Sequence, residues 1–172
     1  KETDFGLDWT LGYAYTNARD VNPMTSSVAF SNFSNYVTRD PLNASLATSD
    51  YETTHRITLN MNYDLDWAPD WSTRFSLFGF AVEGAPYSYV IGSTTFGNTS
   101  VFESAFSSRR QLAYIPTDIN DPNIAPTSNA AAVSALMDFI NSNDDLSDYK
   151  GGIAPRNIAN DDWYSRFDLK IT

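Results

Sequence analysis

The sequence of 172 residues predicts an all-β protein with about four antiparallel strands. Three observations indicate this class. Four stretches alternate between apolar and polar residues, aromatic residues lie within or at the ends of these stretches, and the connections between them differ greatly in length. Each stretch has about the length of a tilted strand that crosses a bilayer. We therefore expect an antiparallel transmembrane β-barrel segment.

The cleanest alternation spans residues 56–63, within a strand expected at about 53–65. Successive side chains of a strand point to opposite faces, so this segment has one apolar and one polar face. On the apolar face we expect Ile57, Leu59 and Met61 to point toward lipid. On the polar face we expect Arg56, Asn60 and Asn62 to point toward the lumen.

The other three stretches follow the same rule with less regularity. In the first, at about 3–16, the lipid-facing candidates are Leu7, Trp9 and Leu11. The third, at about 71–83, has mixed faces, and Arg74 is its lumen-facing candidate. In the fourth, at about 162–172, Leu169 and Ile171 are expected toward lipid, and Arg166, Asp168 and Lys170 toward the lumen. Alternating segments of about ten residues are typical of membrane strands.

The connections predict the topology. Residues 64–70 form a short link rich in Asp, whereas loops at about 17–51 and 84–161 are long. Short turns on one side and long extracellular loops on the other are typical of outer-membrane barrels. In the second loop, Val133, Leu136, Met137 and Ile140 lie at helical spacing and predict a short helix over 129–141, with Ser128 as its N-cap.

Composition limits the function classes. A formal charge of −10 argues against nucleic acid as a partner, because phosphate binding needs clustered Lys and Arg. There is no cysteine, and no run approaches the roughly 18 apolar residues of a membrane helix. There is no initiating Met or apolar leader, so we expect any signal peptide to lie upstream or to be removed.

Few residues suggest site chemistry. His55 is the only histidine and has no second His or Cys to work with, so we expect no enzyme and give His55 a hydrogen-bonding role at the strand's outer rim. Asp118, Asn120, Asp121 and Asn123 form a weak candidate for Ca²⁺, although such runs are ordinary turn formers. Arg156 is expected to anchor loop backbone or a carboxylate. We expect no cofactor.

An ordered set of short motifs resembles the Oar-like branch of the TonB-dependent outer-membrane transporters. The motifs are Tyr15–Pro23, Thr48–Glu52 leading to His55-Arg56, Pro86–Tyr89, Tyr114–Asp118, Gly151–Asn157 and Arg166–Leu169. The set is similar to the late part of that family's barrel and covers most of the chain.

The resemblance implies a barrel of about 22 strands with an N-terminal plug. It also implies a location in the Gram-negative outer membrane, with the long loops extracellular. The expected partners are the rest of the barrel and its plug, membrane lipid, the TonB complex through an N-terminal part not seen here, and possible surface proteins at the loops. This segment would supply wall strands and loops for substrate uptake or surface binding.

Four strands are too few to close a barrel, for which eight is the usual minimum. We therefore expect a segment of a larger barrel. Two alternatives stay open. One is a soluble or secreted β-sandwich binding module, with loop aromatics such as Tyr87 and Tyr89 on a glycan or protein ligand. The other is a non-transporting outer-membrane adhesin or structural barrel.

Overall fold

The computed structural model describes residues 6–34, 36–40, 42–91 and 111–172. These residues form mostly antiparallel β-strands with few helices, so the predicted all-β class is confirmed. The chain divides into two compact units. The first consists of Lys1–Ala18, Tyr51–Ala85 and Asn160–Thr172, and the second of Arg19–Asp50 and Pro86–Ala159.

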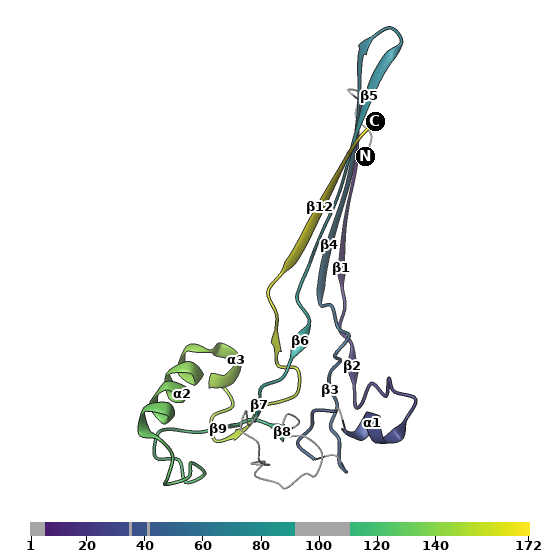
Figure 1. Ribbon diagram of the computed structural model, residues 1–172. Helices are drawn as coiled ribbons and strands as arrows, with labels where there is room; N and C mark the ends of the chain where they lie inside the picture. Colours follow the sequence, from purple (N-terminus) through teal and green to yellow (C-terminus); the bar gives the residue numbers. More distant parts are fainter. Residues whose placement is uncertain (1–5, 35, 41, 92–110) are drawn as a thin grey trace. The chain divides into compact units, whose positions relative to one another are not determined.

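The first unit is a four-stranded antiparallel sheet (Figure 1). Its strands are β1 (Leu7–Tyr15), β4 (His55–Ala68), β5 (Trp71–Val82) and β12 (Tyr164–Ile171). The order in the sheet is β1-β4-β5-β12, so these four strands lie side by side in the order in which they occur along the chain. This up-and-down order is the simplest one that the four alternating stretches allow.

The strand ends differ in detail from the sequence-based bounds. β4 continues to Ala68 and β5 begins at Trp71, so most of the predicted 64–70 link is strand, and only Pro69 and Asp70 separate the two strands. A register shift between Asp66 and Ala68 marks an irregularity beside this turn. β12 begins at Tyr164, so Trp163 precedes the strand. Residues 3–5 of the first predicted strand lie outside the described residues.

The second unit has a small hydrophobic core of its own. Helix α2 (Ala130–Ser142) packs with α3 (Asp144–Ser147) and with the two-strand ladder of β9 (Tyr114–Ile115) and β10 (Gly152–Ile153). The core residues are Ile115, Met137, Ile140, Leu146 and Ala154. The predicted stripe of α2 therefore packs within its own loop.

The predicted helix over 129–141 is confirmed to within one residue, but its N-cap was predicted wrongly and one residue of its stripe is exposed. The N-cap is Asn129, not Ser128, because the Asn129 Oδ1 accepts hydrogen bonds from the backbone N–H of Ala131 at 2.9 Å and Ala132 at 3.3 Å. Ser128 is one residue too early to reach these groups. Leu136 belongs to the predicted stripe but is 45% exposed.

Several short elements had no sequence signal. Helix α1 (Ala29–Ser34) lies in the first long loop, so helices occur in both loops rather than in one. Three further ladders join two-residue strands: β2 (Arg19–Asp20) with β3 (Ala47–Thr48), β7 (Val90–Ile91) with β8 (Gln111–Leu112), and β6 (Pro86–Tyr87) with β11 (Ala159–Asn160). Two residues are too few for a period to be recognised. In the described ranges, no helix is long and apolar enough to cross a membrane.

The core of the second unit gives a first prediction. Ile140 is 1% exposed, whereas Leu136 on the same helix is 45% exposed. Ile140→Ala removes buried methyl groups and leaves a cavity, so we expect a loss of about 2–5 kcal/mol in the free energy of opening of α2. Hydrogen–deuterium exchange of α2 peptides measures this loss. The control Leu136→Ala should cost under about 0.5 kcal/mol, and equal losses for the two variants would contradict the described core.

Candidate functional site

The strand register gathers the lipid-facing candidates on one face of the sheet. Leu11 pairs with Leu59, which pairs with Gly79, which pairs with Phe167. The neighbouring row is Trp9, Met61, Leu77 and Leu169. Directly paired residues share a face, so the apolar residues of all four strands form one continuous surface, called here the apolar face. The eight candidates on it are Leu7, Trp9, Leu11, Ile57, Leu59, Met61, Leu169 and Ile171.

The apolar face is exposed. Leu11 is 60% exposed, Phe167 62% and Leu169 63%. The described residues of the first unit form a single sheet, and among them no element covers either face. Apolar surface of this extent marks a contact with another apolar phase, which is either protein or lipid.

Aromatic rings gather where β4 begins. The His55 ring stacks on Trp163 at 6.3 Å and on Tyr13 at 6.0 Å, and it lies 5.4 Å from Tyr15. The Tyr13 hydroxyl and the His55 Nδ1 are hydrogen-bonded at 2.8 Å. His55 thus has the hydrogen bond expected of it, and three aromatic rings surround its imidazole.

A second aromatic group lies at the hairpin end of the same sheet. The Trp67 and Trp71 rings are 5.6 Å apart, and both side chains are more than 60% exposed. The Trp67 Nε1–H donates a hydrogen bond to the Thr73 Oγ1 at 3.1 Å. Indole rings with one apolar side and one hydrogen-bonding group are suited to a boundary between apolar and aqueous phases.

The lumen-facing candidates lie together on the opposite side, called here the polar face. Asn60 pairs with Phe78, and Asn62 pairs with Ser76. The two asparagine side chains lie on the face opposite to that of Leu59. The Arg74 Nε lies 2.6 Å from Asp64 Oδ1 across the β4–β5 pair, and the Arg166 Nη2 lies 3.0 Å from Asp168 Oδ1 within β12. The full candidate set on this face is Arg56, Asn60, Asn62, Arg74, Arg166, Asp168 and Lys170. Two of its arginines therefore have the carboxylate partners that a purely structural role requires.

Three aromatic residues on the polar face were not singled out from the sequence. Phe78 and Phe80 made the third stretch look mixed, and the register places them with Tyr164 on the polar face. The Phe80 ring lies 5.6 Å from Tyr164 and 6.2 Å from Phe78, and the Arg56 guanidinium carbon lies 5.8 Å from its centroid. The departure from alternation was the available signal.

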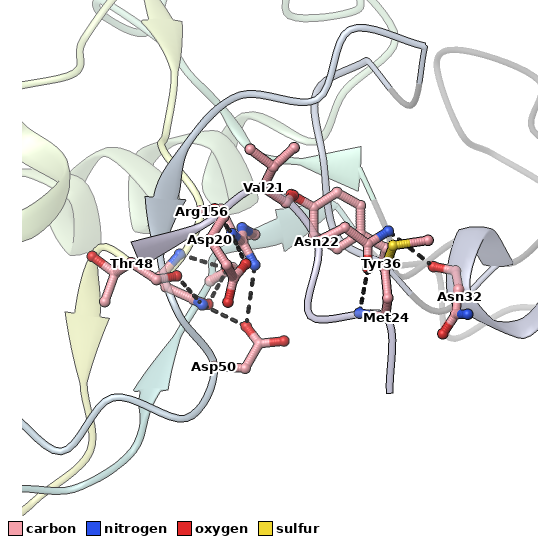
Figure 2. A network of polar contacts seen from close by, with 11 residues as sticks. Asp20, Val21, Asn22, Met24, Asn32, Tyr36, Thr48, Asp50 and Arg156 are labelled. Atoms are coloured by element: carbon pink, nitrogen blue, oxygen red, sulfur yellow. Dashed lines mark hydrogen bonds and ion pairs between the residues drawn. The ribbon is translucent and has the colours of Figure 1, made fainter. Parts of the chain in front are cut away.

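In the second unit, Arg156 is the centre of a polar cluster (Figure 2). Its guanidinium Nη2 donates hydrogen bonds to the Asp20 carbonyl at 2.8 Å and to the Asp20 Oδ1 at 2.7 Å. Its Nη1 lies 3.6 Å from Asp50 Oδ1, and its carbon lies 4.8 Å from the Tyr36 ring centroid. Arg156 is only 5% exposed, so this cation is neutralised and stacked where water is largely excluded.

Asn157 extends the cluster in the same unit. Its backbone has φ of 54°, a left-handed conformation that Asn adopts more readily than most residues. The Asn157 side chain donates to the Thr48 carbonyl at 2.8 Å and accepts from the Ser88 hydroxyl at 2.9 Å. Arg156 and Asn157 together bind segments from both long loops, and this agrees with the anchoring expected for Arg156.

Tyr36 binds the same segment as Arg156, one residue further along the chain. Its hydroxyl donates a hydrogen bond to the Val21 carbonyl. Burial raises the pKa of the Tyr36 phenol, and the positive charge of Arg156 offsets part of that rise. The phenol therefore stays neutral and remains a hydrogen-bond donor.

In the weak calcium candidate at residues 118–123, the carboxylate oxygens accept hydrogen bonds from neighbouring groups of the same loop. The Asp121 carboxylate accepts hydrogen bonds from the Thr117 backbone N–H at 2.8 Å, the Tyr114 hydroxyl at 3.0 Å and the Asn123 backbone N–H at 2.9 Å. These hydrogen bonds hold the pKa of Asp121 well below its usual range, and the backbone N–H groups of Thr117 and Asn123 have the largest effect. The Asp118 Oδ1 accepts from the Asn120 backbone N–H at 2.7 Å.

The turn interpretation of residues 118–123 therefore explains their oxygens better than a cation does. Over the part of the chain that the structure describes, no group of three or more His, Cys, Asp or Glu side chains is placed to hold a metal ion.

The Arg156 cluster gives a second prediction. Arg156→Met leaves the partly buried Asp20 carboxylate without its partner and removes the cation beside Asp50, so we expect the free energy of opening of residues 19–22 and 47–50 to fall by about 3–5 kcal/mol. Hydrogen exchange of these segments measures the change. Arg39→Met is the matched control, because Arg39 is exposed, and it should change the same quantity by less than about 0.5 kcal/mol. Equal protection in both variants would show that the cluster does not hold the loops.

No protein-family model, curated protein or solved structure matches this chain.

Proposed function

We propose that this chain forms part of the wall and the extracellular loops of an outer-membrane β-barrel, of the kind found in TonB-dependent transporters. In such a protein the sheet serves as wall, and the two long loops contribute to substrate uptake or surface binding. One observation carries the proposal. The apolar residues of four strands share one exposed face, with aromatic groups at both ends of that face.

The length of the apolar face fits a bilayer. The two aromatic groups lie at residues 55 and 67 of β4. At about 3.3 Å per residue the distance along the strand is about 40 Å. With a tilt of about 35–45°, that distance spans about 28–33 Å along the membrane normal. The hydrocarbon core of a bilayer is about 30 Å thick, so lipid would cover the apolar residues and leave the rings at the interfaces.

The two edge strands of the sheet, β1 and β12, need further strands to pair with in a membrane. β1 and β12 each pair on one side only in the described residues. An unpaired strand edge is costly in hydrocarbon, because its backbone groups have no water to bond. The wall we propose is closed by further strands, from the same polypeptide or from other chains. The polar face of the sheet then borders the lumen.

The soluble sandwich is the main rival. A sandwich buries its apolar face against a second sheet, and the residues of the first unit that the structure describes form no such layer. An adhesin or structural barrel would share the same wall, and the resemblance to the Oar-like receptors favours the transporter over it.

The apolar face gives a third prediction. Leu59 and Asn60 are adjacent on β4 and lie on opposite faces. In the full-length protein, Leu59→Arg should destabilise the form folded in lipid vesicles, because it places a charge on the lipid side near mid-bilayer. We expect its free energy of unfolding to fall by about 2–4 kcal/mol. Denaturant titration in vesicles measures this, and heat-modifiable migration on a detergent gel reports the folded barrel.

The matched control is Asn60→Arg, which adds the same side chain to the polar face. It should change the free energy of unfolding in vesicles by under about 1 kcal/mol. A greater loss from Asn60→Arg than from Leu59→Arg would invert the assignment of the faces. A protein that folds in water without lipid or detergent, with Leu59 protected from solvent, would favour the sandwich.

A further inference from the structure

We propose that Arg56, Phe78, Phe80 and Tyr164, the aromatic–arginine patch, bind a small ligand that joins a carboxylate to a flat or apolar body. The proposal deepens the proposed function and rests on it, since it takes the polar face as a lining of the lumen. It names a ligand chemistry for one part of that lining, where the faces of the third predicted stretch looked mixed.

The rings of the patch contact one another and remain partly open. Phe80 lies between Phe78 at 6.2 Å and Tyr164 at 5.6 Å, the latter in an edge-on arrangement. Phe78 is 45% exposed and Tyr164 is 55% exposed. Asn60, Asn62 and Ser76 supply hydrophilic side chains further along the same face. Apolar rings on an otherwise polar face gain free energy when a ligand covers them.

The charge of the patch is available to a ligand. Arg74 and Arg166 on the same face are both paired, with Asp64 and Asp168 respectively. Arg56 has no carboxylate partner among residues 6–34, 36–40, 42–91 and 111–172, and its guanidinium carbon lies 5.8 Å from the Phe80 centroid. The Arg56 side chain is exposed. A guanidinium held over a ring can donate to a carboxylate while the ring offers contact to an apolar body.

The size of the patch indicates a small ligand. It extends from β4 across β5 to β12, and strands lie about 4.8 Å apart, so the patch is about 10 Å wide. That width suits a body of one or two rings. The patch has a single unpaired cation in Arg56, and this suits one carboxylate rather than a polyanion, which needs clustered basic residues.

The test uses the full-length protein, folded in detergent micelles, with indole-3-acetate as the carboxylate-bearing probe and tryptophol as its neutral counterpart. Titration followed by saturation-transfer NMR gives the dissociation constants. We expect indole-3-acetate to bind more tightly than tryptophol. Arg56→Gln should weaken indole-3-acetate binding by about fivefold and leave tryptophol unchanged, because only the charged contact is lost.

Two further variants keep the result interpretable. Arg74→Gln removes a paired arginine from the same face and should leave the dissociation constant for indole-3-acetate unchanged within about twofold. Phe78→Leu should weaken both probes, because it removes ring surface that the two ligands share. Equal effects of Arg56→Gln and Arg74→Gln, or equal affinity for the two probes, would overturn the proposal.

The outcome separates this inference from the proposed function. Each variant is first tested for heat-modifiable migration and for folding into vesicles. A wild-type protein that forms no folded membrane species would refute the proposed function and, with it, the patch. A wild-type protein that folds in membranes and binds neither probe at millimolar concentration would refute the patch alone.

Discussion

The structure of the sheet depends on one constraint, the strand register that keeps the large apolar side chains of four strands on one face. The pairing of Leu11 with Leu59 and of Leu59 with Gly79 fixes this arrangement. A slip of one residue in any strand would move its apolar side chains to the other face, because side chains alternate with period two. The backbone hydrogen bonds of the ladder thereby determine which side of the sheet can meet an apolar phase.

The two units of the chain are stabilised by different interactions. The second has a small core around Ile140 and a buried cation, Arg156, that binds Asp20 and stacks on Tyr36. The described part of the first has no comparable core, and Leu11 and Leu169 are more than half exposed. Its hydrophobic stabilisation must come from what covers the apolar face. In our proposal, lipid covers that face between the aromatic groups near His55 and Trp67.

Sequence patterns predicted the long elements well and the irregular ones poorly. Alternation over eight or more residues, as at 56–63, carries enough periods to be recognised, and the helical stripe of α2 does so too. The pattern failed where residues break the rule for a local reason. Phe78 and Phe80 lie in contact on the polar face, with Arg56 over the Phe80 ring, and they made a regular strand look mixed. The Arg156–Asp20 pair joins residues 136 positions apart, and no local pattern predicts such a contact.

The central claim, that the apolar face meets lipid and the polar face meets water, is tested most directly by spin-label accessibility along β4. Nitroxides are placed one at a time at residues 56–63 of the full-length protein in vesicles. Our account predicts that collisions with oxygen peak at 57, 59, 61 and 63, and that collisions with a polar nickel chelate peak at the even positions. Accessibility to the nickel chelate without a two-residue period, or oxygen maxima at the even positions, would contradict it.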